Sequence, residues 1–276
     1  LTLGEVGNLE WSLDRLGVKG KAARVAPRWM AVAAWKELKP RGLVDLARRL
    51  AAAEAAGKPG RRELAGHVCE RLLSDKKAAT VDLGGWRVLA QSLAADTPEA
   101  DRPAWVRGLE AAVRRHGEAG GTLDKYAVDD LKDALETLGQ ETPALTLVDW
   151  MQASEWRAMG PDGLARLAMY LARMAEAGAA GRQAMASHVQ ARYLADSASV
   201  RQVSPKQWDW LTEHLAEDLS AEDRTMWISR IRSAHAGDAE SLRALASHDL
   251  REVVEALKSL GDRKTSVLVA RWITRR

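Results

Sequence analysis

The chain has 276 residues, of which 46% are apolar and 29% charged, and its 41 Lys and Arg against 38 Asp and Glu give a net charge of +3. This composition excludes the disordered, collagen-like and disulfide-stabilised classes. The single cysteine, Cys69, cannot form an intramolecular disulfide or a cysteine-based zinc site, so we expect a reducing compartment. No apolar run approaches the ~18 residues of a membrane span. Because the chain begins at Leu1 without a Met or a signal peptide, we expect a mature or trimmed form, or part of a longer chain.

Amphipathic helical segments recur along the whole chain. Apolar residues at i, i+3/i+4 and i+7 mark seven such segments, which begin near Leu9, Leu46, Leu89, Leu131, Leu167, Leu211 and Leu250. Their spacing of 36 to 44 residues is typical of HEAT or armadillo helical hairpins. Each hairpin also needs a second helix, and we place these at 21–36, 61–75, 101–115, 144–157, 181–196, 223–234 and 264–276. The sequence therefore predicts an all-α protein, a right-handed α-solenoid of about seven helical hairpins, or about 14 helices.

Turn residues divide each hairpin into its two helices. In one example we expect the first helix at Leu43–Ala56, the loop at Gly57–Gly60 and the second helix at Arg61–Leu73. Glycine commonly ends a helix in the left-handed conformation, and five glycines have this place: Gly17, Gly57, Gly139, Gly178 and Gly261. The other two hairpins lack such a glycine, and we expect Thr97 and Ser220 to cap the helices that follow.

A tandem duplication of about 121 residues extends over these hairpins. Trp29 and Trp35 recur as Trp150 and Trp156 at an offset of 121. At an offset of 122, Trp86 and Trp105 recur as Trp208 and Trp227, and Trp150 recurs as Trp272. We therefore expect residues 1–276 to form one continuous solenoid. Its sections are the end of a partial unit at 1–28, a first repeat unit at 29–149, a second at 150–271 and the start of a third at 272–276.

The aromatic residues are 11 Trp and 3 Tyr, with no Phe. Most of the Trp residues lie at equivalent places on the apolar stripe of consecutive hairpins, where large rings fill gaps between helical layers. A row of exposed rings would instead offer stacking platforms for single-stranded nucleic acid. We favour the core interpretation because of the amphipathic placement.

Motifs for catalysis or metal binding are missing from the sequence. It has no phosphate-binding loop and no His-Glu-x-x-His, and its six His are scattered without ligand spacing. His67 recurs as His188 together with its whole helix, so repeat packing explains both. Cys69 lies two residues from His67, a spacing that turns the two side chains apart on a helix. We assign no catalytic, cofactor-binding or metal-ligating residues and expect no cofactor.

Charge is distributed unevenly between the two sets of helices. The seven second-helix windows together carry +12, which leaves −9 for the rest of the chain. In a stacked array all second helices lie on one side, so one side should be basic. Arginine suits bidentate contact with phosphate. The candidate nucleic-acid-binding residues are Lys21, Arg24, Arg28, Arg102, Arg107, Arg114, Arg115, Arg230, Arg232 and Arg271. Alternatively, these residues form an ordinary solvated face whose Arg stems cover apolar surface.

Two stretches resemble octotricopeptide-type repeats: Leu38–Leu50, which closes with Glu63–Leu73, and Asp249–Gly261. Such repeats, and their relatives in RAP-domain proteins, are α-hairpins found mostly in organellar RNA-binding proteins. The chain departs from them in lacking a Pro-Pro start and a RAP domain, and in its irregular spacing. The resemblance implies a class of function, RNA binding, and a mitochondrial or plastid location, but no individual binding residues. Without it, a cytoplasmic location is expected.

We therefore expect a non-enzymatic helical-repeat protein that binds RNA, or lies in a ribonucleoprotein assembly, through the basic second helices. The alternative is a protein–protein interaction scaffold, or a structural subunit whose unfinished ends dock other chains. An end at Trp272, within a repeat unit, leaves an apolar face that a larger assembly or a longer chain would cover.

Overall fold

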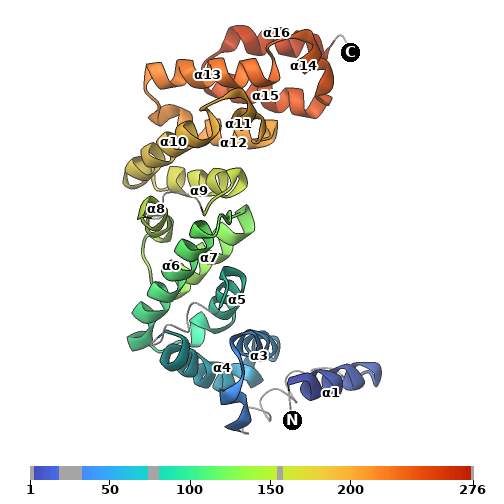
Figure 1. Ribbon diagram of the computed structural model, residues 1–276, viewed down its shortest axis with the longest axis vertical. Coiled ribbons are helices and arrows are strands. Elements are labelled where there is room, and N and C mark those ends of the chain that lie inside the picture. The colour runs from blue at the N-terminus through green and yellow to red at the C-terminus, as the bar shows by residue number, and fades with distance from the viewer. Residues whose placement is uncertain (1–2, 19–32, 74–80, 154–157, 275–276) are drawn as a thin grey trace. The chain divides into compact units, whose positions relative to one another are not determined.

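The computed structural model describes residues 3–18, 33–73, 81–153 and 158–274 (Figure 1). These residues form 15 α-helices, several short 3₁₀ or π-helical turns, and an isolated β-bridge between Leu123 and Met159, so the predicted all-α class is confirmed. The chain divides into two compact units, one of residues 1–121 and 129–143 and the other of residues 122–128 and 144–276. No helix in the described ranges combines the length and the apolar character needed to cross a membrane.

The first compact unit consists of packed helical hairpins. Helix α3 packs against its partner α4 and against the next first helix, α5, which in turn packs against α6. An ion pair and hydrogen bond between Arg87 of α5 and Asp130 connect α5 to α7. The helices up to this point are α1 (Leu3–Arg15), α3 (Pro40–Ala52), α4 (Glu54–Val68), α5 (Leu83–Leu93), α6 (Arg102–Glu118) and α7 (Lys125–Thr137).

The second compact unit repeats this packing over three hairpins. Helix α9 packs against α10 and α12, α12 packs against α15, and α15 packs against α16. The first helices α9, α12 and α15 therefore form a row, and their apolar stripes are buried. The helices from α8 onward are α8 (Pro143–Ala153), α9 (Pro161–Arg173), α10 (Ala179–Tyr193), α11 (Ser197–Arg201), α12 (Pro205–Leu215), α13 (Ala221–His235), α14 (Ala239–Ala244), α15 (Ser247–Ser259) and α16 (Arg263–Ile273).

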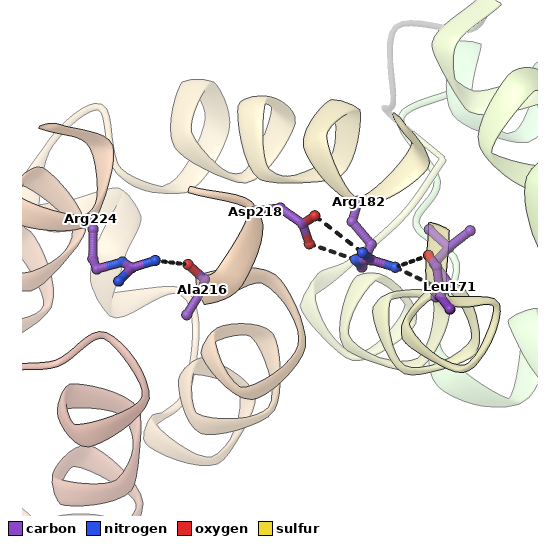
Figure 2. A network of polar contacts seen from close by, with 6 residues as sticks. Leu171, Arg182, Ala216, Asp218 and Arg224 are labelled. Atoms are coloured by element: carbon purple, nitrogen blue, oxygen red, sulfur yellow. Dashed lines mark hydrogen bonds and ion pairs between the residues drawn. The ribbon is translucent and has the colours of Figure 1, made fainter. Parts of the chain in front are cut away.

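A nearly buried arginine, Arg182, joins consecutive hairpins of the second unit (Figure 2). Its Nη1 donates hydrogen bonds to the carbonyl oxygens of Leu171 (3.0 Å) and Ala175 (2.9 Å), at the end of α9 and in the turn after it. Its Nε lies 2.5 Å from Oδ2 of Asp218, in the turn after α12. Carbonyls at a helix C-terminus lack the usual N–H partner four residues later, so one guanidinium can bind them and tie one hairpin to the next. We call Arg182 and Asp218 the hairpin clasp.

The first unit contains the same clasp at offsets of 121 and 122 residues. Arg61 donates to the carbonyls of Leu50 (3.0 Å) and Glu54 (2.6 Å), and its Nε lies 2.5 Å from Asp96. Glu54 and its counterpart Ala175 both have positive φ, 48° and 49°. This left-handed turn aims the carbonyls at the arginine, although neither residue is a glycine.

The expected hairpin loop at Gly57–Gly60 is wrong, because these residues lie inside α4, which begins at Glu54. Gly57 and Gly178 do not have the left-handed conformation predicted for them, whereas Gly17, Gly139 and Gly261 do, with φ of 69°, 86° and 92°. At Gly57 and Gly178 the need is for space, since a Cβ would lie 2.0 or 2.1 Å from the carbonyl oxygen of Leu50 or Leu171. The glycines allow the second helix to approach the carbonyls that the clasp binds.

The two predicted N-caps have different outcomes. Ser220 caps α13 as expected, because its Oγ accepts a hydrogen bond from the Asp223 N–H at 3.0 Å. Thr97 is not a cap, since its hydroxyl donates to the Leu93 carbonyl while Asp101 precedes α6. The difference arises because a short 3₁₀ turn at Glu99–Asp101 separates Thr97 from that helix.

Tryptophans form the centre of the hairpins, as the core interpretation predicts. Trp86 and Trp105 are fully buried and meet edge to face with centroids 6.0 Å apart, and Trp208 and Trp227 do the same at 5.9 Å. Trp35 and Trp150 are also buried. Trp11, by contrast, is 60% exposed, while Trp29 and Trp156 lie outside the described residues. Each edge-to-face pair joins the first and second helices of one hairpin.

The clasp yields a prediction about stability. Replacing Asp218 with Ala leaves the Arg182 guanidinium nearly buried, with 14% of its side chain exposed, and without its carboxylate. We expect a loss of about 3 kcal/mol in the free energy of unfolding, measured by urea denaturation. The matched control is Glu217→Ala, at an exposed neighbour, which should change stability by less than ~0.5 kcal/mol. Equal stability of the two variants would contradict a stabilising clasp.

The tryptophan core yields a second prediction. Trp227→Ala removes a fully buried ring and its contact with Trp208, so it should lower the free energy of unfolding by roughly 3–5 kcal/mol. Trp11→Ala, which removes a largely exposed ring, should cost less than ~1 kcal/mol. Thermal and urea unfolding of both variants would test this difference, and similar losses would contradict the core assignment.

Candidate functional site

The arginines predicted to bind nucleic acid have different surroundings. Arg107, Arg230, Arg232 and Arg271 are exposed, whereas Arg102, Arg114 and Arg115 are half-buried. Arg114 forms an ion pair with Glu110 one turn earlier in α6, so part of its charge is neutralised within the helix. Lys21, Arg24 and Arg28 lie outside the described residues.

The described second helices of the first unit have mixed charge. On α4 and α6 the exposed cations are Lys58, Arg62 and Arg107, and the exposed acids are Glu54, Glu63 and Glu118. Arg61 is engaged in the clasp and is not part of the surface charge. These two helices therefore present no continuous basic surface.

The second helices of the last two hairpins, α13 and α16, are strongly basic. Their exposed cations are Arg230, Arg232, Arg263, Lys264 and Arg271. Their acidic residues are confined to Glu222 and Asp223 in the first turn of α13, and α16 has none. We call α13 and α16 the C-terminal basic helices. Of the sequence-predicted residues, the structure places Arg230, Arg232 and Arg271 here.

Helix stability does not account for all of this charge. Arg232 and Arg271 lie in the last turns of α13 and α16, where a cation complements the helix dipole. Arg263 and Lys264 occupy the first turn of α16, where the dipole disfavours positive charge. These two cations therefore do not stabilise their own helix through its dipole.

The first-helix row of the second unit contains a groove between α9 and α12 that the sequence reasoning missed. Its volume is about 580 Å³. We call it the α9–α12 groove, and its lining residues are Arg166, Met169, Ala172, Arg173, Trp210, Glu213 and His214. Arg166 and Arg173 lie two turns apart on α9, so they share one face of the helix.

Each wall of the groove combines apolar and charged groups. A guanidinium nitrogen of Arg166 lies 3.9 Å from the Met169 sulfur, and one of Arg173 lies 3.8 Å from the same atom. On the opposite wall lies the half-buried Trp210 ring, and the ammonium of Lys206, which does not line the groove, is 5.0 Å from the ring centroid. Burial lowers the pKa of His214, against the opposing effect of the Glu213 carboxylate, so the imidazole is neutral at pH 7.

The signal for this groove lies in the positions that do not repeat. The large buried residues of α9 and α12, such as Leu164 and Trp208, recur in α3 and α5 at offsets of 121 and 122, whereas every groove residue except Ala172 differs from its counterpart. Arg166, Arg173 and Trp210 correspond to Asp45, Ala52 and Val88. Residues that recur at this offset therefore identify the core but not the groove.

Carboxylates gather on the neighbouring faces of α12 and α15. Burial raises the pKa of Asp209 to about 7, and a hydrogen bond with Glu252 and the charges of Glu252, Glu213 and Glu255 add to the rise. This is an electrostatic property of the first-helix row and not a metal site. Within the described ranges, no three His, Cys, Asp or Glu side chains are grouped so as to hold a metal ion.

Cys69 is half-buried. Burial and the nearby Asp101 carboxylate raise the pKa of its thiol, which leaves little thiolate at pH 7. His67, two residues earlier, meets the Trp35 ring edge to face at 5.0 Å. This contact gives His67 the packing role that the repeat predicts.

Comparison with known proteins gives no family for this chain. No protein-family model, curated protein or solved structure matches it. The C-terminal basic helices and the α9–α12 groove are therefore the basis for assigning a function.

The raised pKa of Asp209 predicts a pH dependence of stability. The folded protein keeps a proton on Asp209 that the unfolded chain releases near pH 4, so this group lowers stability as the pH rises from about 4 to about 7. Asp209→Asn removes the effect. We expect it to stabilise the protein by roughly 1–2 kcal/mol more at pH 8 than at pH 5, because partial exposure weakens the full effect.

Urea denaturation at the two pH values would measure this difference. Glu217→Gln, at an exposed position of the turn after α12, is the control and should follow the unmodified protein at both pH values. A constant difference between Asp209→Asn and the unmodified protein at pH 5 and pH 8 would contradict a raised pKa.

Proposed function

We propose that this chain is a non-enzymatic helical-repeat protein that binds RNA through its second helices, as part of a ribonucleoprotein assembly. The observation that carries this proposal is the charge of the C-terminal basic helices, where Arg230, Arg232, Arg263, Lys264 and Arg271 are exposed. Cations in the first turn of α16 oppose the helix dipole, which favours a function in binding over one in helix stability.

Phosphate is the anion that best fits this surface. Four of its five cations are arginines, whose planar guanidinium donates two parallel hydrogen bonds to a phosphate. An array of such contacts gives an affinity that depends strongly on salt, because each neutralised phosphate releases counterions. RNA supplies phosphates at regular spacing and so matches a surface of several separate cations.

A protein-binding scaffold is the second candidate, and α16 supports it. Val267 and Leu268 are 48% and 57% exposed on this helix, and Trp272 and Ile273 are half-buried. Exposed apolar residues next to charged ones are typical of protein interfaces. A protein partner would contact these apolar side chains, and its affinity would depend less on salt than that of RNA.

The proposal predicts the effect of reversing charge on α13. Arg230→Glu with Arg232→Glu removes two exposed cations, so binding of a short single-stranded RNA pool should weaken by at least ~10-fold near 50 mM salt. The slope of log affinity against log salt should fall by about 2. Fluorescence anisotropy over a salt series would measure both quantities.

The matched control is Arg251→Glu with Lys258→Glu, which makes the same change in net charge on the first helix α15. It should retain most of the affinity and of the salt slope. Absence of binding near 50 mM salt, or an affinity that ignores salt, would contradict RNA binding. Loss of RNA binding to the same extent in both double variants would contradict the assignment to the second helices.

A further inference from the structure

The α9–α12 groove has the chemistry of a binding site for a small anion with a flat ring. Its two arginines come from α9, and its large aromatic wall, Trp210, comes from α12. None of these three residues is needed by the repeat, because Asp45, Ala52 and Val88 stand at the equivalent positions of the first unit. The groove is therefore a feature added to the repeated fold and not a consequence of it.

The spacing of the arginines fits a single phosphate. Because a nitrogen of each guanidinium lies within 3.9 Å of the same Met169 sulfur, these two nitrogens are at most about 8 Å apart. Two hydrogen bonds of about 2.9 Å to different oxygens of one phosphate span a gap of this size. The arginines can therefore hold one phosphate between them, above the Met169 thioether.

The opposite wall fits a planar ring. Trp210 is half-buried and lines the groove. A base that stacks on an indole gains affinity whatever its sequence identity. Neutral His214, beside Trp210 in the lining, supplies both a hydrogen-bond donor and an acceptor.

We propose that the α9–α12 groove binds a nucleotide, with its phosphate between Arg166 and Arg173 and its base against Trp210. The nucleotide is either free or one residue of a bound RNA strand. This goes beyond the RNA binding proposed for α13 and α16, because the groove lies on the first helices. An acidic peptide fits less well, since its carboxylates would leave the Trp210 surface without a matching ring.

Isothermal titration calorimetry of the full chain would test the groove. The ligands are a nucleoside monophosphate, the matching nucleoside, inorganic phosphate, an oligoglutamate peptide and a short single-stranded RNA. We expect the monophosphate to bind at least ~10-fold more tightly than the nucleoside or inorganic phosphate, because only it engages both walls. Loss of RNA affinity in Arg173→Gln would identify a strand as the source, whereas RNA binding that Arg173→Gln leaves unchanged, with monophosphate binding lost, would identify the free nucleotide.

Substitutions of groove residues would show whether the nucleoside monophosphate binds in the groove. Arg173→Gln and Trp210→Leu should each weaken monophosphate binding by about tenfold or more. Arg173 is exposed, so its variant is expected to fold, and thermal unfolding would check Trp210→Leu, whose ring is half-buried. Arg251→Gln on α15 is the matched control and should bind like the unmodified protein.

Two results would overturn this inference: monophosphate binding no tighter than that of inorganic phosphate or oligoglutamate, or binding that Arg173→Gln leaves unchanged. Its failure is distinguishable from failure of the proposed function. RNA binding that depends on Arg230 and Arg232, together with monophosphate binding that Arg173→Gln leaves unchanged, would overturn the groove assignment alone. Monophosphate binding in the groove, without salt-dependent RNA binding, would overturn the proposed function alone.

Discussion

The fold depends on how the first helix of each hairpin ends beside the second. At that end, in each unit, one arginine donates hydrogen bonds to a carbonyl of the last turn and to one of the turn that follows, while its Nε pairs with an aspartate of the next hairpin. The left-handed Glu54 and Ala175 turn the carbonyls toward the arginine, and Gly57 and Gly178 leave room for the approach. A charge taken into the interior is tolerated only when it is paired and hydrogen-bonded, so these residues must be present together.

Because the clasp lies between the helices, the outward-facing residues are not needed to hold the hairpins together. The clasp, the tryptophan pairs and the leucine stripes fill the interior at matching positions in both units. Outward-facing residues of the same helices differ, as Arg166 and Trp210 do from Asp45 and Val88. In a repeat protein, stability resides in the shared interior and in contacts between neighbouring repeats, so binding residues can differ from one repeat to the next.

Part of the candidate site was predictable from sequence and part was not. The charge of the second helices pointed to Arg230, Arg232 and Arg271, and all three are exposed in the structure. It also selected Arg114, which forms an ion pair with Glu110, because a charge count does not show which side chains neutralise each other. The α9–α12 groove was missed because its walls come from residues about 40 positions apart, and only the packing of α9 against α12 brings Arg173 and Trp210 together.

The sequence by itself determined the helical class, the hairpin spacing and the burial of the described tryptophans other than Trp11, Trp210 and Trp272. These properties follow from the period of apolar residues, which is local information. Only the tertiary structure shows three other properties. These are the lack of space for a side chain at Gly57, the ion pair that takes Arg61 out of the surface charge, and the position of the α9–α12 groove. The physical reason is that each of these properties depends on distances between atoms of different helices. The period of apolar residues identifies which face of a helix is buried, but it does not identify the residues of the other helix that pack against that face.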